Sequence, residues 1–136
     1  MADRTAVLVN QITIAGTETV IGGTIGLDHG TTVLAALAKL VVAGGGTTVS
    51  VYIQTSLDRG VTWIDIMNLA FTTSTASKVS AVNTAIALAA AGTPGDGALT
   101  ANTILNGLLG DRIRCKYVVA GTYTGASHLT VTTISN

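Results

Sequence analysis

Apolar and polar side chains alternate over several short segments of the chain, and this period of two is typical of β-strands. The clearest case is residues 48–55, where Val49, Val51 and Ile53 share one face. The same pattern predicts further strands over four ranges: 6–14, 62–66, 112–119 and 127–134. Chain order then predicts that 48–55 pairs with 62–66, and that the last two strands form a closing hairpin.

Residues 31–43 fit two interpretations. Leu34, Leu37 and Leu40 fall near helical spacing, and Ala and Leu are good helix formers, so the pattern alone slightly favours a helix. A Gly-Gly-Gly run follows at 44–46 and leads directly into the strand 48–55. That arrangement favours a hairpin instead, with its first arm near residues 39–43.

The remaining segments are a bent strand, an undecided segment and a loop. Residues 19–27 predict a strand that is bulged or bent, because Gly22 and Gly23 interrupt it. A polar Ser/Thr run precedes the Ala-rich residues 82–91, which fit a strand or a helix equally well. The strongest loop signal is 93–97, Thr-Pro-Gly-Asp-Gly, because proline fixes φ and glycine permits positive φ.

The composition supports an all-β fold. Threonine makes up about one residue in six, and with valine and isoleucine it favours pleated, half-buried surfaces. About eight short strands at these intervals are typical of a sandwich. We therefore expect residues 1–136 to form a single β-sandwich domain, jelly-roll-like, with long loops.

Charge and composition also narrow the function. The seven Lys and Arg balance the seven Asp and Glu, so the chain lacks the basic excess that nucleic-acid binding needs. No apolar run is long enough to span a membrane, and we expect a soluble protein with neither kind of partner. Only 10% of residues are charged, whereas about a quarter is usual, which indicates that part of the surface is covered in an assembly. The alternative is that Ala, Gly and Thr raise the apolar content without forming patches.

One local motif has a recognisable logic, Ser-x-Asp-x-Gly-x-Thr-Trp at Ser56, Asp58, Gly60, Thr62 and Trp63. It resembles the Asp-box of sialidases and related β-propellers, which is a hairpin turn. Here the serine and aspartate can bond turn amides, the glycine can take positive φ, and the tryptophan can lie over the base of the turn. The motif occurs once, so we interpret it as a structural turn and keep glycan binding as the alternative.

Two longer stretches resemble small structural proteins of tailed bacteriophages. They are residues 49–66, and residues 109–117 followed by the turn at 121–125. The proteins they resemble are β-sandwich or jelly-roll virion components, and the likeness is to capsid decoration, or cement, proteins. The matched stretches cover about a quarter of the chain.

The resemblance implies a non-enzymatic bacteriophage protein that stabilises the head shell through subunit contacts. Its partners would be the major capsid protein and further copies of itself, and we expect a trimer. It would be made in the host cytoplasm and would lie on the outer capsid surface. The alternatives are a head-tail or tail component of the virion, or a carbohydrate-binding module using Trp63, Tyr52 and Tyr123.

Two groups of residues are candidate interface positions. Residues 1–14 are a candidate N-terminal arm that adds a strand to a neighbour, with the apolar positions Val7, Val9 and Ile12. The alternative is that residues 6–14 form an integral strand of the sandwich. The second group is a row of cations that alternation places on one face of a strand: Arg112, Arg114 and Lys116. This row predicts either pairing within the chain, with Asp58, Asp65 or Asp111, or a salt-bridge seam between subunits.

The sequence predicts no catalytic, metal or cofactor site. His29, His128 and Cys115 lack the spacing of a zinc set, and the glycine runs lack the residues of a phosphate loop. A triad of Ser56, His29 and Asp65 has nothing in its spacing that selects it. We therefore expect a protein that is not an enzyme.

Overall fold

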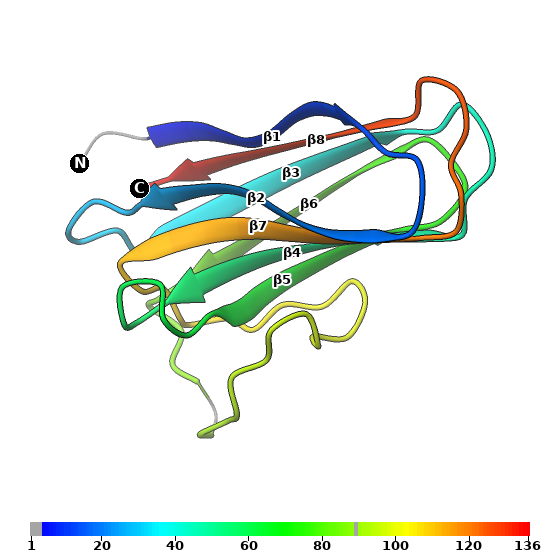
Figure 1. Ribbon diagram of the computed structural model, residues 1–136. Helices are drawn as coiled ribbons and strands as arrows, with labels where there is room; N and C mark the ends of the chain where they lie inside the picture. The colour runs from blue at the N-terminus through cyan, green and yellow to red at the C-terminus, as the bar shows by residue number, and fades with distance from the viewer. Residues whose placement is uncertain (1–3, 89) are drawn as a thin grey trace.

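A computed structural model describes residues 4–88 and 90–136, and it confirms the all-β prediction (Figure 1). The described residues form eight strands and no helix, and none of them lies in a helix able to cross a membrane. The strands are β1 (Arg4–Thr13), β2 (Glu18–Gly26), β3 (Val33–Val41), β4 (Thr48–Ser56), β5 (Ile64–Phe71), β6 (Ala76–Asn83), β7 (Arg112–Ala120) and β8 (His128–Ser135).

The strands form two four-stranded antiparallel sheets that pack face to face. Sheet A has the order β1-β8-β3-β6, and sheet B has the order β2-β7-β4-β5. Apart from β4 and β5, strands that follow one another in the chain lie in opposite sheets (Figure 1). Eight strands that cross between two sheets in this way form a jelly roll.

The core lies between the sheets and follows the period of two. In β7 the odd positions Ile113, Cys115, Tyr117 and Val119 are buried, while the even positions face outward. Burial among these side chains raises the pKa of the Cys115 thiol to about 12, so the sulfur stays protonated and inert.

The structure decides between the two interpretations of residues 31–43, because the segment forms a strand and not a helix. Residues 33–41 form β3, which pairs with β8 on one side and β6 on the other. Its inward side chains, such as Leu34 and Leu40, are buried, and its outward positions include Leu37, which is apolar as well. A strand that is apolar on both faces loses the alternating pattern, and spacing alone cannot then separate it from a helix.

Two predicted hairpins were also wrong. β3 and β4 lie in different sheets, and so do β7 and β8, so neither pair is hydrogen-bonded. Their connections cross from one sheet to the other. The hairpin of β4 and β5 is present, and β2 has the predicted irregularity, a register shift between Ile21 and Thr24.

The N-terminal strand is an integral part of sheet A. β1 pairs with β8 from Arg4↔Ser135 to Thr13↔His128, with two register shifts. Leu8 and Val9 are buried in the core. Within the described residues the segment is therefore a core strand and not a free arm, because its backbone finds its partner inside the same chain. Residues 1–3 of the predicted arm lie outside the described residues.

One connection is long, the loop 84–111 between β6 and β7. It contains the predicted Thr-Pro-Gly-Asp-Gly loop and most of the undecided segment 82–91, of which residues 82 and 83 belong to β6. The loop runs beside β5, where Met67 forms a bridge with Ile104 (Figure 1). It returns to the sandwich at Asp111, whose amide donates to Ser56 O at 3.0 Å.

Candidate assembly surface

The Ser56–Trp63 turn joins β4 to β5 and is closed by its own side chains. Ser56 Oγ accepts from the Gly60 amide at 2.8 Å and donates to Asp58 Oδ1 at 2.9 Å. Asp58 Oδ1 also accepts from the Thr62 amide at 2.7 Å. The bonds from Thr62 hold the pKa of the Asp58 carboxyl below its usual value, because they favour the charged form. These contacts are those of a structural turn.

Trp63 lies against this turn without entering the core. A Cβ added to Gly60 would lie 3.5 Å from its Cζ2. The Arg114 guanidinium stacks over the indole, 4.4 Å from the ring centre, which is the geometry of a cation–π contact. The guanidinium covers one face of the indole, which a sugar platform would need open.

The cation row on β7 is paired within the chain. Arg112 contacts Asp111 at 3.2 Å, while Arg114 and Lys116 both contact Asp96 Oδ1, at 3.5 and 2.9 Å. Asp111 was among the predicted partners, whereas Asp96, which lies in the same 84–111 loop, was not. A hydrogen bond from Gln54 is the main cause that lowers the pKa of the Asp96 carboxyl, and a hydrogen bond from Lys116 is the second. The role of Arg112, Arg114 and Lys116 at a subunit interface stays a prediction.

Asp65 fastens the 84–111 loop to the outer face of sheet B. The carboxylate is 3% exposed and accepts from the amides of Gly97 at 2.9 Å, Ala98 at 2.7 Å and Leu99 at 3.1 Å. Gln54 Nε2 donates to it as well, at 2.7 Å. A buried carboxylate with four donors is well satisfied, so this group holds a loop and is not free for chemistry.

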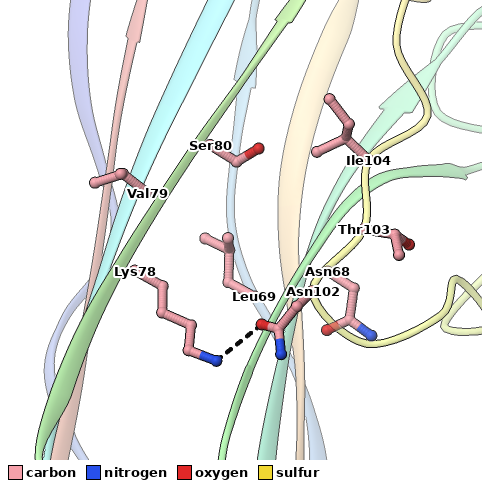
Figure 2. A pocket seen from close by; sticks show the side chains of 8 residues that line it. All are labelled: Asn68, Leu69, Lys78, Val79, Ser80, Asn102, Thr103 and Ile104. Carbon is pink, nitrogen blue, oxygen red and sulfur yellow. Dashed lines mark hydrogen bonds between the residues drawn. The ribbon is translucent and has the colours of Figure 1, made fainter.

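A cleft of about 320 Å³, lined by both polar and apolar side chains, opens where β5, β6 and the loop meet (Figure 2). Lys78 donates to Ala70 O, and to Asn102 Oδ1 at 2.9 Å. Asn68 Nδ2 donates to Leu99 O at 2.8 Å, and its buried Oδ1 has no partner among the described residues. The polar groups of this cleft mainly tie the loop to the two strands, and one amide oxygen does not define a ligand.

One part of the outer face of sheet A differs from all of these sites because it is uncharged and mostly apolar. Two rows of facing residues cross all four strands in the order β1, β8, β3, β6. The first row is Thr5, Ile134, Ala35 and Ala81, and the second is Val7, Thr132, Leu37 and Val79. We call these eight residues the apolar face.

The apolar face has no charged residue. Among the described residues, no segment makes hydrogen bonds to its outward side chains. Val79 is 74% exposed and Val7 is 55% exposed. Between the protruding side chains lies a hollow of about 570 Å³, lined by small residues such as Ala35 and Ala81. An antiparallel sheet with one solvated face normally carries polar side chains there, so this face is typical of a surface that another molecule covers.

The predicted interface positions of β1 separate in the structure. Val7 belongs to the apolar face, Val9 is 3% exposed in the core, and Ile12 is 46% exposed beside a groove between β1 and β2. Sequence reasoning missed Ala35 and Leu37 because the 31–43 segment stayed undecided between a helix and a hairpin with its first arm near residues 39–43. The available signal was the second set of apolar positions at Val33, Ala35 and Leu37, which a strand turns outward.

The histidines and the cysteine are not brought together. Among the described residues no three His, Cys, Asp or Glu side chains cluster in a way that could hold a metal ion. Ser56 and Asp65 are each engaged in the bonds described above, and His29 lies in the loop between β2 and β3.

Comparisons with known proteins place the chain by its fold. No family model and no curated protein sequence matches it. Among solved structures, it is similar to a chain in the "Structure of infectious bursal disease virus Gx strain", with a TM-score of 0.54 and 9% sequence identity. The match covers 98% of this chain and 31% of that chain, so this chain spans about a third of its neighbour's length. At this identity the likeness shows a shared fold.

Proposed function

We propose that this chain is a non-enzymatic structural protein of a virus particle that decorates and stabilises the outer surface of the head. The observation that carries the proposal is a jelly roll with an uncharged, uncovered apolar face. Jelly rolls recur in viral capsid domains, although lectins and cupins also use them. The fold likeness to a chain from a virus structure and the resemblance of residues 49–66 to phage virion proteins point the same way.

The proposed mechanism is cementing. A decoration protein that contacts two neighbouring capsid subunits buries apolar surface that separation of those subunits would expose again. The small side chains of this protein, Ala, Thr and Val, allow close packing against a partner. In this proposal the chain carries out no reaction, and its partners are the major capsid protein and further copies of itself.

The test is addition of the purified protein to heads of the encoding virus that lack it. We expect the protein to cosediment with the heads and to raise the temperature at which they release DNA. Cryo-electron microscopy should then place it on the outer shell. Heads that bind no protein would contradict the proposal, and density confined to the head-tail junction or tail would replace it with the alternative virion role.

A further inference from the structure

We propose that Asn106 and Gly107 form a self-modifying site, at which the folded chain converts the Asn106 carboxamide to a carboxylate unaided by another protein. Asn106 is the only asparagine of the sequence that a glycine follows, and both residues lie in the 84–111 loop. The inference concerns this loop and does not rest on the proposed virion role.

The Asn106 side chain is folded over the nitrogen that would attack it. The Gly107 amide donates to Asn106 Oδ1 at 3.0 Å, so its nitrogen lies beside the carboxamide group. Gly107 has no Cβ to hinder a closer approach, and its φ of +95° is in the region that favours glycine. Two reacting groups that are already held in contact have less freedom to lose, which lowers the barrier for joining them.

A second amide polarises the same carbonyl group. Asn83, the last residue of β6, donates its backbone N–H to Asn106 Oδ1 at 2.7 Å. When a nitrogen adds to the carboxamide carbon, negative charge develops on this oxygen, and a fixed amide donor at such a distance stabilises it. The fold therefore supplies both the attacking nitrogen and a donor for the oxyanion.

The reaction needs only water. The Gly107 nitrogen loses its proton to hydroxide and forms a bond to Asn106 Cγ. The bond from Cγ to the side-chain nitrogen then breaks, and that nitrogen takes a proton from water and leaves as ammonia, which regenerates hydroxide. Water adds to either carbonyl of the resulting cyclic imide and opens the ring to aspartate or isoaspartate. Each event adds one negative charge to a chain whose formal net charge is zero.

Two other sites of the same loop each lack one part of this arrangement. Asn102 Oδ1 accepts from a backbone amide at 3.0 Å and from an ammonium group at 2.9 Å, but Thr103 follows it, and a branched side chain crowds the attacking nitrogen. Asp96 is followed by a glycine, but the Gly97 amide donates to Asp65 at 2.9 Å and so points away from Asp96. Both sites serve as internal controls.

The experiment is incubation of the purified full chain at neutral pH, with peptide mapping by mass spectrometry and an isoaspartate assay over time. The same chain unfolded in urea is the comparison, because it keeps the sequence but loses the Asn83 donor. A peptide of residues 101–111, measured with and without urea, corrects for the effect of urea on the chemistry. We expect Asn106 to react about tenfold faster in the folded chain than in the unfolded chain. Asn102 and Asp96 should stay unmodified in the folded chain.

Asn83→Pro removes the donor itself. This N–H is directed to the loop and not to β3, and proline is tolerated at such edge positions. The variant should react at Asn106 no faster than the unfolded wild type. Asn106→Gln is the negative control, because its longer side chain places the carboxamide out of register with the Gly107 nitrogen, and it should gain no charge on ion exchange.

An Asn106 that reacts in the folded chain as slowly as in the unfolded chain, or more slowly, would overturn the inference. So would equal rates at Asn106 and Asn102. A cooperative thermal transition shows that Asn83→Pro is folded, and a folded variant that reacts as fast as the wild type would remove the oxyanion donor from the proposal. If the variant does not fold, the comparison of folded and unfolded wild type decides.

Discussion

Gly60 shows how one backbone conformation fixes the turn between β4 and β5. Its φ is +90°, in the region that favours glycine, and the atoms nearest to an added Cβ lie 3.5 Å away, so there is room for a methyl group. Gly60→Ala should therefore lower the free energy of unfolding through backbone strain alone, by about 1–2 kcal/mol. Denaturant titration of the purified variant measures this.

Gly16→Ala is the matched control. Gly16 has an ordinary φ and no heavy atom within 4 Å of the added Cβ, so its substitution should leave stability unchanged or raise it by up to about 1 kcal/mol. If the two variants unfold at the same denaturant concentration, strain at Gly60 does not contribute to the fold.

Individual residues of this turn could be predicted from the sequence more fully than their surroundings. Ser56, Asp58 and Gly60 act within a few positions of one another, so their hydrogen bonds and φ angle follow from local spacing. The environment of Trp63 does not. Its stacking with Arg114 depends on β7 lying beside β4, a contact between residues 51 positions apart in the chain.

At the scale of elements, the 84–111 loop is held by one buried side chain. Asp65→Asn removes the carboxylate that accepts hydrogen bonds from three loop amides. The side-chain NH₂ group that replaces one of its oxygens is itself a donor and faces those N–H groups. We expect a loss of about 2–3 kcal/mol of stability. Amide hydrogen exchange at residues 97–99 should speed up more than exchange in β4, because the loop loses its attachment first.

Asp111→Asn provides the comparison for that experiment. Asp111 pairs with the adjacent Arg112 on the surface, and such exposed pairs contribute little. Its substitution should change stability by less than about 1 kcal/mol. Exchange at 97–99 that is equally slow in the Asp65 and Asp111 variants would show that the loop is fastened by other contacts.

Strand positions could be predicted where one face of the strand is polar, as in β4, β7 and β8. They could not be predicted in β3, where both faces are apolar, one packed in the core and the other on the apolar face. The 84–111 loop was recognised around 93–97, but its attachment to Asp65 was not, because the two segments are about 30 residues apart and no local pattern links them.

At the scale of the whole molecule, the jelly-roll-like sandwich followed from the sequence, but the pairing of successive strands did not. Composition and strand spacing are enough to predict a sandwich, because they reflect how much of each strand is buried. Whether two successive strands pair or cross between sheets depends on the geometry of the connection. The predicted hairpins of β3 with β4 and β7 with β8 failed for this reason.

The position of β8 between β1 and β3 has a consequence for the order of events during synthesis. In sheet A, β8 lies between β1 and β3 and pairs with both. Neither β1 nor the edge of β3 that faces β8 therefore has its partner until residues 128–135 have left the ribosome. Pairings that distant in sequence close slowly, and we expect refolding in milliseconds to seconds, measurable by stopped-flow tryptophan fluorescence. A chain ending at residue 127 should show no cooperative thermal transition, whereas native-like melting of that fragment would mean that sheet B and the core assemble without the last strand.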